Sequence, residues 1–317
     1  MTITERTGTT TSTATTAPAG ATAASAGPAA ALAAALDGPL VSTQWLADHL
    51  GADGLVVLDA TVVPSQGPDG RPVYLSGRDR FLGEGHIPGS VFADLLETFS
   101  DPTGRFPFTR PEAAAFEAAA AELGIGADTT VVVADAAVGQ WAARLWYLFR
   151  SLGHDRVAVL DGGVKAWRAE GRPLEQSPER PAAPGDVAPL LADPRPGFWI
   201  STEEVAEIVA GTRPGALVCG TPPRDFAARH IPGSLSAPAV RLVDRDTNTL
   251  LPERELRELF ADVLDAPGPI VVYCGAGIAA ASDALALGLL GRDDVLLYDG
   301  SLSEWAADPA APLASAA

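Results

Sequence analysis

The chain has 317 residues, 47% of them hydrophobic and 20% charged, and this length and composition allow two domains with packed cores. Its formal net charge of −18 argues against nucleic acid and anionic membranes as general partners, because both repel an acidic surface. Two cysteines, Cys219 and Cys274, are too few for a disulfide framework. No apolar run is long enough to span a membrane, and no secretory signal is recognisable, so we expect a soluble protein of the cytoplasm.

Composition divides the chain into four parts. Residues 1–37 are almost entirely Thr, Ala, Ser, Gly and Pro and predict a disordered tail, because such residues cannot offset the entropy lost on ordering. Residues 38–175 and 199–317 are predicted to form two domains. The proline-rich stretch 176–198 is predicted to be the linker between them.

Both predicted domains alternate short apolar runs with helical patterns. The predicted buried strands are Leu55–Leu58, Thr130–Val133, Val157–Leu160, Ala216–Val218, Ile270–Tyr273 and Val295–Tyr298. The predicted helices are Pro111–Leu123, Gln140–Leu152, Glu253–Leu264 and Ala279–Leu290. This alternation predicts the α/β class, with a parallel sheet in each domain and helices on both of its faces.

The second domain repeats the motifs of the first in the same order, which indicates a tandem duplication. The sequence HIPGS occurs at His86–Ser90 and again at His230–Ser234. At a similar offset, 139 positions against 144 for HIPGS, Asp135 of the first copy corresponds to Cys274 of the second. The first copy also carries an insertion before its HIPGS motif, and the Gly/Pro/Ser-rich stretch Pro64–Arg78 is predicted to be a surface loop.

Cys274 ends a predicted strand, and a glycine-bearing loop follows it and leads into a predicted helix. Ligands of parallel α/β sheets bind beyond the carboxyl ends of the strands. In such a loop, converging backbone N–H groups and the helix dipole stabilise a thiolate and any anion carried by its sulfur. Spacing alone leaves a second interpretation open, in which Cys274 is a buried residue that acts as a small hydrophobe.

Over roughly residues 40–312 the chain resembles the tandem rhodanese family of sulfurtransferases. The motifs that carry the resemblance are the two HIPGS sequences, the loop Cys274–Ala280, the run Tyr298–Trp305 and the aspartate at position 135. The resemblance implies two tandem rhodanese-like domains, with Cys274 as the nucleophile that takes up sulfur as a persulfide. It also implies that no cofactor or metal is needed and that the first domain is inactive, because a carboxylate cannot carry sulfur.

The loop after Cys274 lacks the basic residues of thiosulfate sulfurtransferases and is closer to that of 3-mercaptopyruvate sulfurtransferases. It departs from the latter at Ala276 and Ala279, where those enzymes have a serine and a threonine. Thr221 replaces the arginine that binds the substrate carboxylate in the family. The substrate-binding residues expected on this basis are Gly275, Ala276, Gly277, Ile278, Ala279, Arg224 and Arg229.

His86 is expected to be catalytic, facing the cleft between the domains and assisting proton transfer. The alternative for His86 is a turn histidine bonded to the backbone, which is the interpretation we give to His230. Cys219 is interpreted as a buried strand-end residue, with resolution of the persulfide as the alternative. Arg224 and Arg229 are surface charges in the alternative interpretation.

The functional prediction is a sulfurtransferase that moves sulfur from a small donor, 3-mercaptopyruvate or else thiosulfate, to a thiol, cyanide or a protein acceptor. Two alternatives stay open: a noncatalytic or regulatory sulfur-binding module, and a dedicated sulfur relay to a biosynthetic partner. We expect a monomer or weak dimer that binds neither nucleic acid nor membranes.

Overall fold

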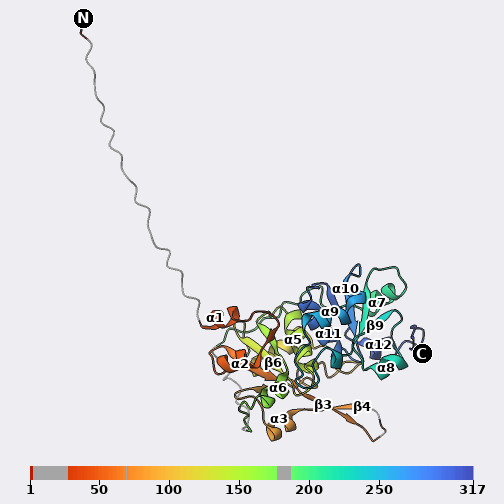
Figure 1. The fold of residues 1–317 in the computed structure, drawn as a ribbon, viewed down its shortest axis with the longest axis horizontal. Helices are drawn as coiled ribbons and strands as arrows, with labels where there is room; N and C mark the ends of the chain where they lie inside the picture. The colour runs from red at the N-terminus through yellow and green to blue at the C-terminus, as the bar shows by residue number, and fades with distance from the viewer. Residues whose placement is uncertain (3–27, 69, 71, 177–186, 317) are drawn as a thin grey trace.

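The computed structural model describes residues 1–2, 28–68, 70, 72–176 and 187–316. Within these residues the chain forms two parallel sheets, one in each predicted domain, and a separate antiparallel hairpin (Figure 1). The first sheet has the strand order β1-β7-β6-β2-β5 and the second β11-β10-β8-β9. An isolated parallel bridge from Trp199 to Leu297 extends the second sheet where β1 pairs with β7 in the first. The two sheets therefore share one topology.

The strands are β1 (Leu40–Val41), β2 (Leu55–Asp59), β3 (Val62–Gln66), β4 (Pro72–Ser76), β5 (Val91–Phe92), β6 (Thr130–Ala134), β7 (Val157–Leu160), β8 (Ala216–Cys219), β9 (Ser234–Ser236), β10 (Ile270–Tyr273) and β11 (Val295–Leu297). The helices of the first copy are α1 (Pro28–Ala34), α2 (Thr43–His49), α3 (Arg78–Glu84), α4 (Ala113–Glu122), α5 (Gln140–Ser151) and α6 (Gly163–Ala169). Those of the second copy are α7 (Thr202–Val209), α8 (Pro223–Ala228), the 3-10 turn η1 (Ala239–Arg241), α9 (Glu253–Leu259), α10 (Ala261–Leu264), α11 (Ala279–Leu289) and α12 (Ser301–Trp305).

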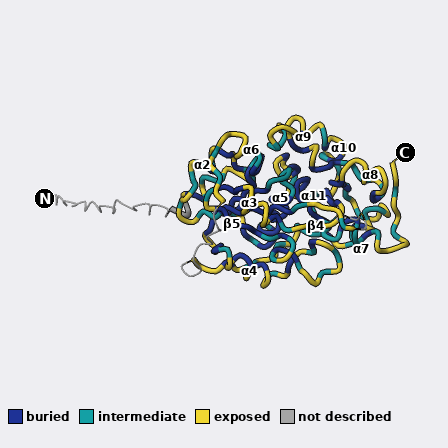
Figure 2. Tube along the Cα trace, turned by 90° about the horizontal axis from the view of Figure 1, so that it is seen from below, coloured by how far each residue is buried: buried dark blue, intermediate teal, exposed yellow. Residues whose placement is uncertain are grey.

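Helices cover both faces of each sheet, as predicted. In the first copy α4 and α5 pack on one face and α2 and α6 on the other, and in the second copy α9–α11 and α7 with α12 do the same. The inner faces belong to one continuous apolar core that includes residues of both copies, such as Phe149 and Leu285. Helices α5 and α11 lie side by side at the centre of this core (Figures 1 and 2). Burial of this apolar surface joins the two copies into one body.

The predicted strands match the observed ones to within one residue at each end. The predicted helix Glu253–Leu264 is instead two helices, because Phe260 has a non-helical backbone with ψ of 8°. The Pro64–Arg78 stretch was wrongly predicted to be a loop. Most of it belongs to the β3–β4 hairpin, because Val73, Tyr74 and Leu75 are strand formers that pair with β3.

The predicted tail lies partly outside the described residues, at 3–27. Its last ten residues pack on the first copy: they include α1, Leu32 is buried, and the carbonyl of Ala35 accepts a hydrogen bond from Trp45 Nε1 at 3.0 Å. The predicted boundary at residue 37 therefore differs from the structure, in which the chain is packed from about Leu32 on.

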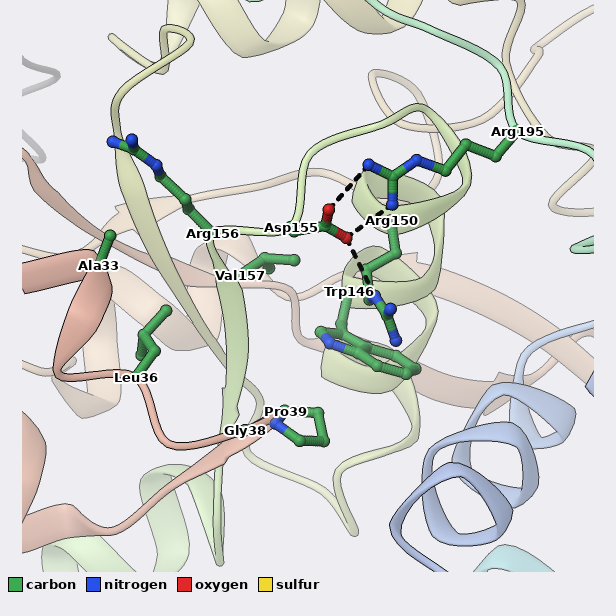
Figure 3. Close-up of a pocket in the computed structure, with 10 residues that line it drawn as sticks. All are labelled: Ala33, Leu36, Gly38, Pro39, Trp146, Arg150, Asp155, Arg156, Val157 and Arg195. Carbon is green, nitrogen blue, oxygen red and sulfur yellow. Dashed lines mark hydrogen bonds and ion pairs between the residues drawn. The ribbon is translucent and has the colours of Figure 1, made fainter. Parts of the chain in front are cut away.

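The described end of the predicted linker is fixed to the first copy. Nη1 and Nη2 of Arg195 each donate to one oxygen of the Asp155 carboxylate at 2.7 Å. Arg150 lies on the other side of the same carboxylate (Figure 3). Trp146 and Pro39 border the same hollow, whose volume is about 520 Å³. It lies at the amino end of β7, the opposite end of the strands from the edge where ligands of α/β sheets bind. Within the described ranges, no helix is long and apolar enough to cross a membrane.

Candidate active site

Cys274 follows the last residue of β10, at the carboxyl edge of the second sheet, and its loop leads into α11. Its thiol is free, and only 4% of the residue is exposed. Its neighbours in the loop differ in burial: Gly275 is exposed, whereas Gly277 and Ile278 are buried. The exposed part of the loop is thus at Gly275, next to the cysteine.

Ser301, the first residue of α12, positions this loop. Its hydroxyl accepts hydrogen bonds from the N–H groups of Cys274 at 3.1 Å and Gly277 at 3.0 Å, and it donates to the carbonyl of Tyr298 at 2.8 Å. The residue is fully buried and has a positive φ of 50°, a costly backbone conformation for a serine. Gly277 also has a positive φ, and a Cβ at this position would approach the Asp299 carbonyl oxygen to 2.7 Å.

The corresponding loop of the first copy encloses an anion that belongs to the protein itself. The carboxylate of Asp135 is fully buried and accepts hydrogen bonds from four backbone N–H groups, those of Ala137, Gly139, Trp141 and Ala142, at 2.8–3.1 Å. Burial raises the pKa of this carboxyl, and the four hydrogen bonds act in the opposite direction. A loop of this shape is therefore a cradle for a negatively charged group.

The second copy has a loop of the same length without the carboxylate, and its left-handed residue is Gly277, one position earlier than Gly139 in the first loop. Ala276, Ile278 and Ala280 correspond to three of the residues that bind Asp135, and their N–H groups form no hydrogen bond to any described residue. The start of α11 adds its positive dipole end to these donors. The loop after Cys274 thus has the donors of the first cradle and leaves them available.

A buried arginine of the first copy, Arg144, contacts the Cys274 loop through the carbonyl of Gly277. Arg144 of α5 donates to the Asp299 carboxylate at 2.7 Å, to the Phe108 carbonyl at 2.9 Å and, more weakly, to the Gly277 carbonyl at 3.4 Å. Its side chain is 1% exposed, and it lies over the Trp199 ring. Because these partners come from both copies, Arg144 fixes the first copy against the Cys274 loop.

The first copy also contributes aromatic residues beside the loop. Phe108, which has a positive φ of 59°, is buried, and Tyr74 of the β3–β4 hairpin packs edge-on against its ring at 5.0 Å. Tyr74 also packs against Trp141 at 6.0 Å. Burial raises the pKa of Tyr74, and the Coulomb effects of Cys274 and Asp225 raise it further.

Comparison with known proteins agrees with this geometry. The model of the rhodanese-like domain matches residues 42–170 and again residues 201–308. The chain belongs to the rhodanese family. It is 36% identical over 284 residues to 3-mercaptopyruvate sulfurtransferase from Homo sapiens, covering 84% of this chain and 91% of the relative. It is 34% identical over 284 residues to thiosulfate sulfurtransferase from Gallus gallus, covering 86% and 95%.

A solved rhodanese structure has the same arrangement. The chain superposes on the 3-mercaptopyruvate sulfotransferase SseA from Escherichia coli with a TM-score of 0.72 and 30% sequence identity, covering 83% of this chain and 98% of SseA. The tandem rhodanese fold predicted from the duplicated motifs is confirmed, and the protein is a sulfurtransferase.

His86, predicted to be catalytic, has the same surroundings as its counterpart in the second copy. It is 1% exposed, its ring stacks on Phe81 at 3.8 Å, and its Nδ1 lies 3.1 Å from the Phe81 carbonyl. His230 stacks on Phe226 at 3.9 Å with its Nδ1 at 2.8 Å from that carbonyl. The described residues include no contact between His86 and Cys274. This repeated environment supports a structural role for both rings, and a catalytic role of His86 stays a prediction.

Arg224 and Arg229 lie on and just after α8, the helix that also carries Asp225. Both are exposed, and neither guanidinium group forms a hydrogen bond or ion pair with any residue that the structure describes. Both arginines are thus available to an anionic ligand, although their role as substrate ligands stays a prediction.

Cys219 ends β8 beside Tyr273, but it packs in a different apolar cluster from Cys274. It is fully buried, its sulfur lies 3.1 Å from the Thr221 hydroxyl, and burial raises the pKa of its thiol. The same position in the first copy is Asp59, whose carboxylate accepts from the Thr61 hydroxyl. Cys219 therefore occupies a structural position of the fold.

Sequence reasoning missed several residues that border Cys274. The sequence pointed to Ser301 only through the repeated motif in which Asp299-Gly300-Ser301 matches Asp161-Gly162-Gly163 of the first copy. Arg144 was interpreted from the sequence as a structural residue at a position that resembles one of the family, whereas Phe108 and Tyr74 were not singled out. All three are far from Cys274 in the chain, and the docking of the two copies connects them to its loop.

Proposed function

We propose that the protein transfers sulfur through a persulfide on Cys274, with 3-mercaptopyruvate as its donor. The observation that carries this proposal is the pair of matching loops. Four N–H groups bind the Asp135 carboxylate in the first copy, and the matching loop of the second copy has a thiol in that place. The three matching N–H groups that are free in the second copy, those of Ala276, Ile278 and Ala280, would stabilise the negative charge of a thiolate and then of a persulfide on Cys274.

The first half-reaction forms a sulfur–sulfur bond. The Cys274 thiolate attacks the donor sulfur, the carbon–sulfur bond breaks with its electron pair going to carbon, and the thiol proton ends on that carbon. The products are the persulfide anion and pyruvate. With thiosulfate, the sulfur–sulfur bond of the donor breaks instead, and sulfite leaves with the electron pair.

The second half-reaction restores the enzyme. A nucleophile such as cyanide or a thiolate attacks the outer sulfur, and the Cys274 thiolate leaves with the electron pair of the sulfur–sulfur bond. Because one product leaves before the acceptor reacts, ping-pong kinetics are expected. The loop, rather than an added cofactor, carries the charge through both steps in this proposal.

Charge on the loop supports a monoanionic organic donor over thiosulfate. None of the residues Gly275–Ala280 is basic, so nothing in the loop offsets the double charge of thiosulfate. Arg224 on α8 and Arg229 just after it are available for a single carboxylate, as are the loop N–H groups of Ala276 and Ile278.

The test is thiocyanate formation from cyanide with each donor in turn, using wild type and Cys274→Ser. We expect parallel lines in double-reciprocal plots, a higher kcat/KM with mercaptopyruvate, and no turnover above background in Cys274→Ser. Turnover by Cys274→Ser would overturn the proposed carrier. A higher kcat/KM with thiosulfate would overturn only the proposed donor.

A second candidate is a dedicated relay that passes the persulfide to one protein acceptor. The position of Thr221 favours it, because its hydroxyl is engaged with Cys219 where the family has a carboxylate-binding arginine. A relay would load sulfur on Cys274 and release it slowly to cyanide. Rapid release to cyanide in the experiment above would count against it.

The cellular compartment, the excluded partners and the oligomeric state are also proposals. A persulfide carrier with two free thiols suits a reducing compartment such as the cytoplasm. The net charge of −18 supports a protein that avoids nucleic acid and anionic membranes, and we propose a monomer or weak dimer. Sedimentation at micromolar concentration tests the last point, and a stable higher oligomer would contradict it.

A further inference from the structure

The β3–β4 hairpin distinguishes the two copies more than any other element near the site. Asp59 precedes His86 by 27 positions in the first copy, whereas Cys219 precedes His230 by 11 in the second. The additional residues form two antiparallel strands in which Tyr74 pairs with Pro64. In Figures 1 and 2 the hairpin runs from the first copy toward the second, ending on the side where α8 lies.

The base of the hairpin is fixed to the first sheet. Gly77 donates its N–H to the Thr61 carbonyl at 3.1 Å, and a Cβ on Gly77 would approach that oxygen to 2.2 Å. The hydroxyl of Ser76 donates to the Asp94 carboxylate at 2.8 Å. These contacts set the direction in which the two strands leave the sheet.

The ring of Tyr74 is held in one place. It packs edge-on against Phe108, at an interplanar angle of 72°, and against Trp141, at 76°. Phe108 is in turn joined to the Cys274 loop through Arg144, which donates to the carbonyls of both Phe108 and Gly277. A short chain of contacts therefore fixes Tyr74 relative to the reacting sulfur.

The hydroxyl of Tyr74 differs from those of the other three tyrosines. Tyr147 donates to the Phe198 carbonyl, Tyr273 is bonded to the Ile231 N–H and the Ser234 hydroxyl, and Tyr298 to the Thr202 hydroxyl. Tyr74 forms no hydrogen bond with the described part of the chain, and the residue is 39% exposed. Its ring is packed, while its polar end is left for another partner.

Charge determines the kind of partner that this hydroxyl can have. Burial raises the pKa of Tyr74, and the negative charges of Cys274 and Asp225 raise it further, so the phenol stays protonated and acts as a donor. A donor that Phe108 and Arg144 connect to the Cys274 loop can bind an acceptor oxygen on a molecule that approaches this loop. Arg224, which follows Pro223 on α8 beside Asp225, offers a positive charge to the same anionic molecule.

We propose that Tyr74 is a donor-binding residue of the Cys274 site, whose hydroxyl donates a hydrogen bond to an oxyanion of the sulfur donor. That oxyanion is the carboxylate of a mercapto acid or the sulfonate end of thiosulfate. This inference rests on the proposed role of Cys274. It assigns a function to the inserted hairpin: one copy supplies the sulfur carrier, and the other supplies a ligand for the body of the donor.

The kinetic test compares Tyr74→Phe, which removes only the hydroxyl, with Leu75→Ala. Leu75 is the next residue of β4, points to the other face of the hairpin and is exposed. One hydrogen bond to a charged group predicts about a tenfold rise in donor KM for Tyr74→Phe, with kcat within about twofold. The KM for cyanide and the behaviour of Leu75→Ala should be unchanged. The experiment uses both donors, and the one whose KM rises identifies the oxyanion.

A binding measurement separates this inference from the proposed function. Cys274→Ser cannot take up sulfur, so calorimetry with mercaptopyruvate or thiosulfate measures donor binding without turnover. We expect Tyr74→Phe in this background to raise the donor Kd about tenfold, and Leu75→Ala to leave it unchanged. An unchanged Kd in Tyr74→Phe, an equal rise in Leu75→Ala, or no binding of either donor would overturn the role of Tyr74, whatever the wild type does in turnover.

Discussion

The loops that follow β6 and β10 both join a strand to a helix over the same number of residues, but the first begins with an aspartate and the second with a cysteine. In the first copy the loop binds the carboxylate of Asp135 through four N–H groups, and the residue is fully buried. In the second copy the same position is Cys274, and three of the matching N–H groups have no partner among the described residues. The first loop thus holds an anion of the protein itself, and the second has free donors for the thiolate and persulfide that we propose on Cys274.

Each copy also donates hydrogen bonds to an aspartate of the other copy. Asp299 of the second copy accepts from Arg144 and from the Arg110 N–H of the first copy. Asp161, the matching residue of the first copy, accepts from the Leu250 N–H of the second at 2.7 Å. Each copy therefore supplies hydrogen-bond donors to the aspartate in the Asp-Gly turn of the other copy.

The largest effect is expected when Cys274 is replaced by aspartate, the residue that the first copy has at this position. In Cys274→Asp the carboxylate should accept the free N–H groups, as Asp135 does. Sulfur transfer should fall by about 10⁴-fold or more, because the nucleophile is gone, while the thermal midpoint should be equal to or above that of Cys274→Ser. Thiocyanate assays and thermal unfolding measure the two effects. A midpoint well below that of Cys274→Ser would contradict the equivalence of the loops.

Removal of the Asp135 carboxylate from the first loop should mainly lower the free energy of unfolding. Asp135→Ala leaves four N–H groups of a buried loop without their acceptor, and we expect the free energy of unfolding to fall by about 3 kcal/mol. The donor KM should change little, because Asp135 does not contact the donor. Chemical denaturation measures the first effect and steady-state kinetics the second. A stability equal to that of wild type would show that the carboxylate does not organise its loop.

Asp283 offers a contrast to Asp135, because it is also a buried carboxyl. Its two oxygens have no hydrogen-bond partner in the described part of the chain, and burial raises its pKa well above its ordinary value. Between the unfolded and folded pKa values the folded state retains a proton that the unfolded state has lost. The free energy of unfolding contributed by this group therefore falls as pH rises through that window.

We expect Asp283→Leu, which has a similar shape, to be more stable than wild type at pH 7 by about 1–3 kcal/mol. In Asp283→Asn, the rise in the free energy of unfolding that wild type shows as pH falls toward 4 should be absent. Thermal unfolding between pH 4 and pH 7 tests both variants. The prediction is wrong if wild type and Asp283→Asn show the same dependence on pH.

The smallest expected effect concerns the residue behind each loop. Ser301 binds the N–H groups of Cys274 and Gly277, whereas the first copy has Gly163 there, at a φ of 55°. Ser301→Gly removes both hydrogen bonds and relieves the strained backbone, so stability should change by no more than about 1 kcal/mol.

The activity of Ser301→Gly should fall about fivefold to tenfold, because the Cys274 loop loses a support. Ser301→Ala, which keeps the strain, should be less stable than Ser301→Gly. Kinetics and thermal unfolding of the two variants provide the comparison. Full activity in both would mean that the hydroxyl does not position the loop.

The sequence predicted what depends on local pattern and on repetition. The buried strands were found because their apolar runs are continuous, and Cys274 was found because its loop joins a strand to a helix. The β3–β4 hairpin was missed because the strand formers Val73–Leu75 lie within a stretch rich in Gly, Pro and Ser. Arg144 and Asp299 are 155 positions apart, so their contact depends on how the domains dock, which no local pattern encodes.

The central claim is that sulfur is carried on Cys274 and on no other residue. Its most direct test is to load the wild type and Cys274→Ser with mercaptopyruvate without an acceptor, alkylate the products and locate the added sulfur by peptide mass spectrometry. We predict one additional sulfur atom per chain, on the peptide that contains Cys274, and none in the variant. Sulfur on the Cys219 peptide, or any sulfur uptake by Cys274→Ser, would contradict this account.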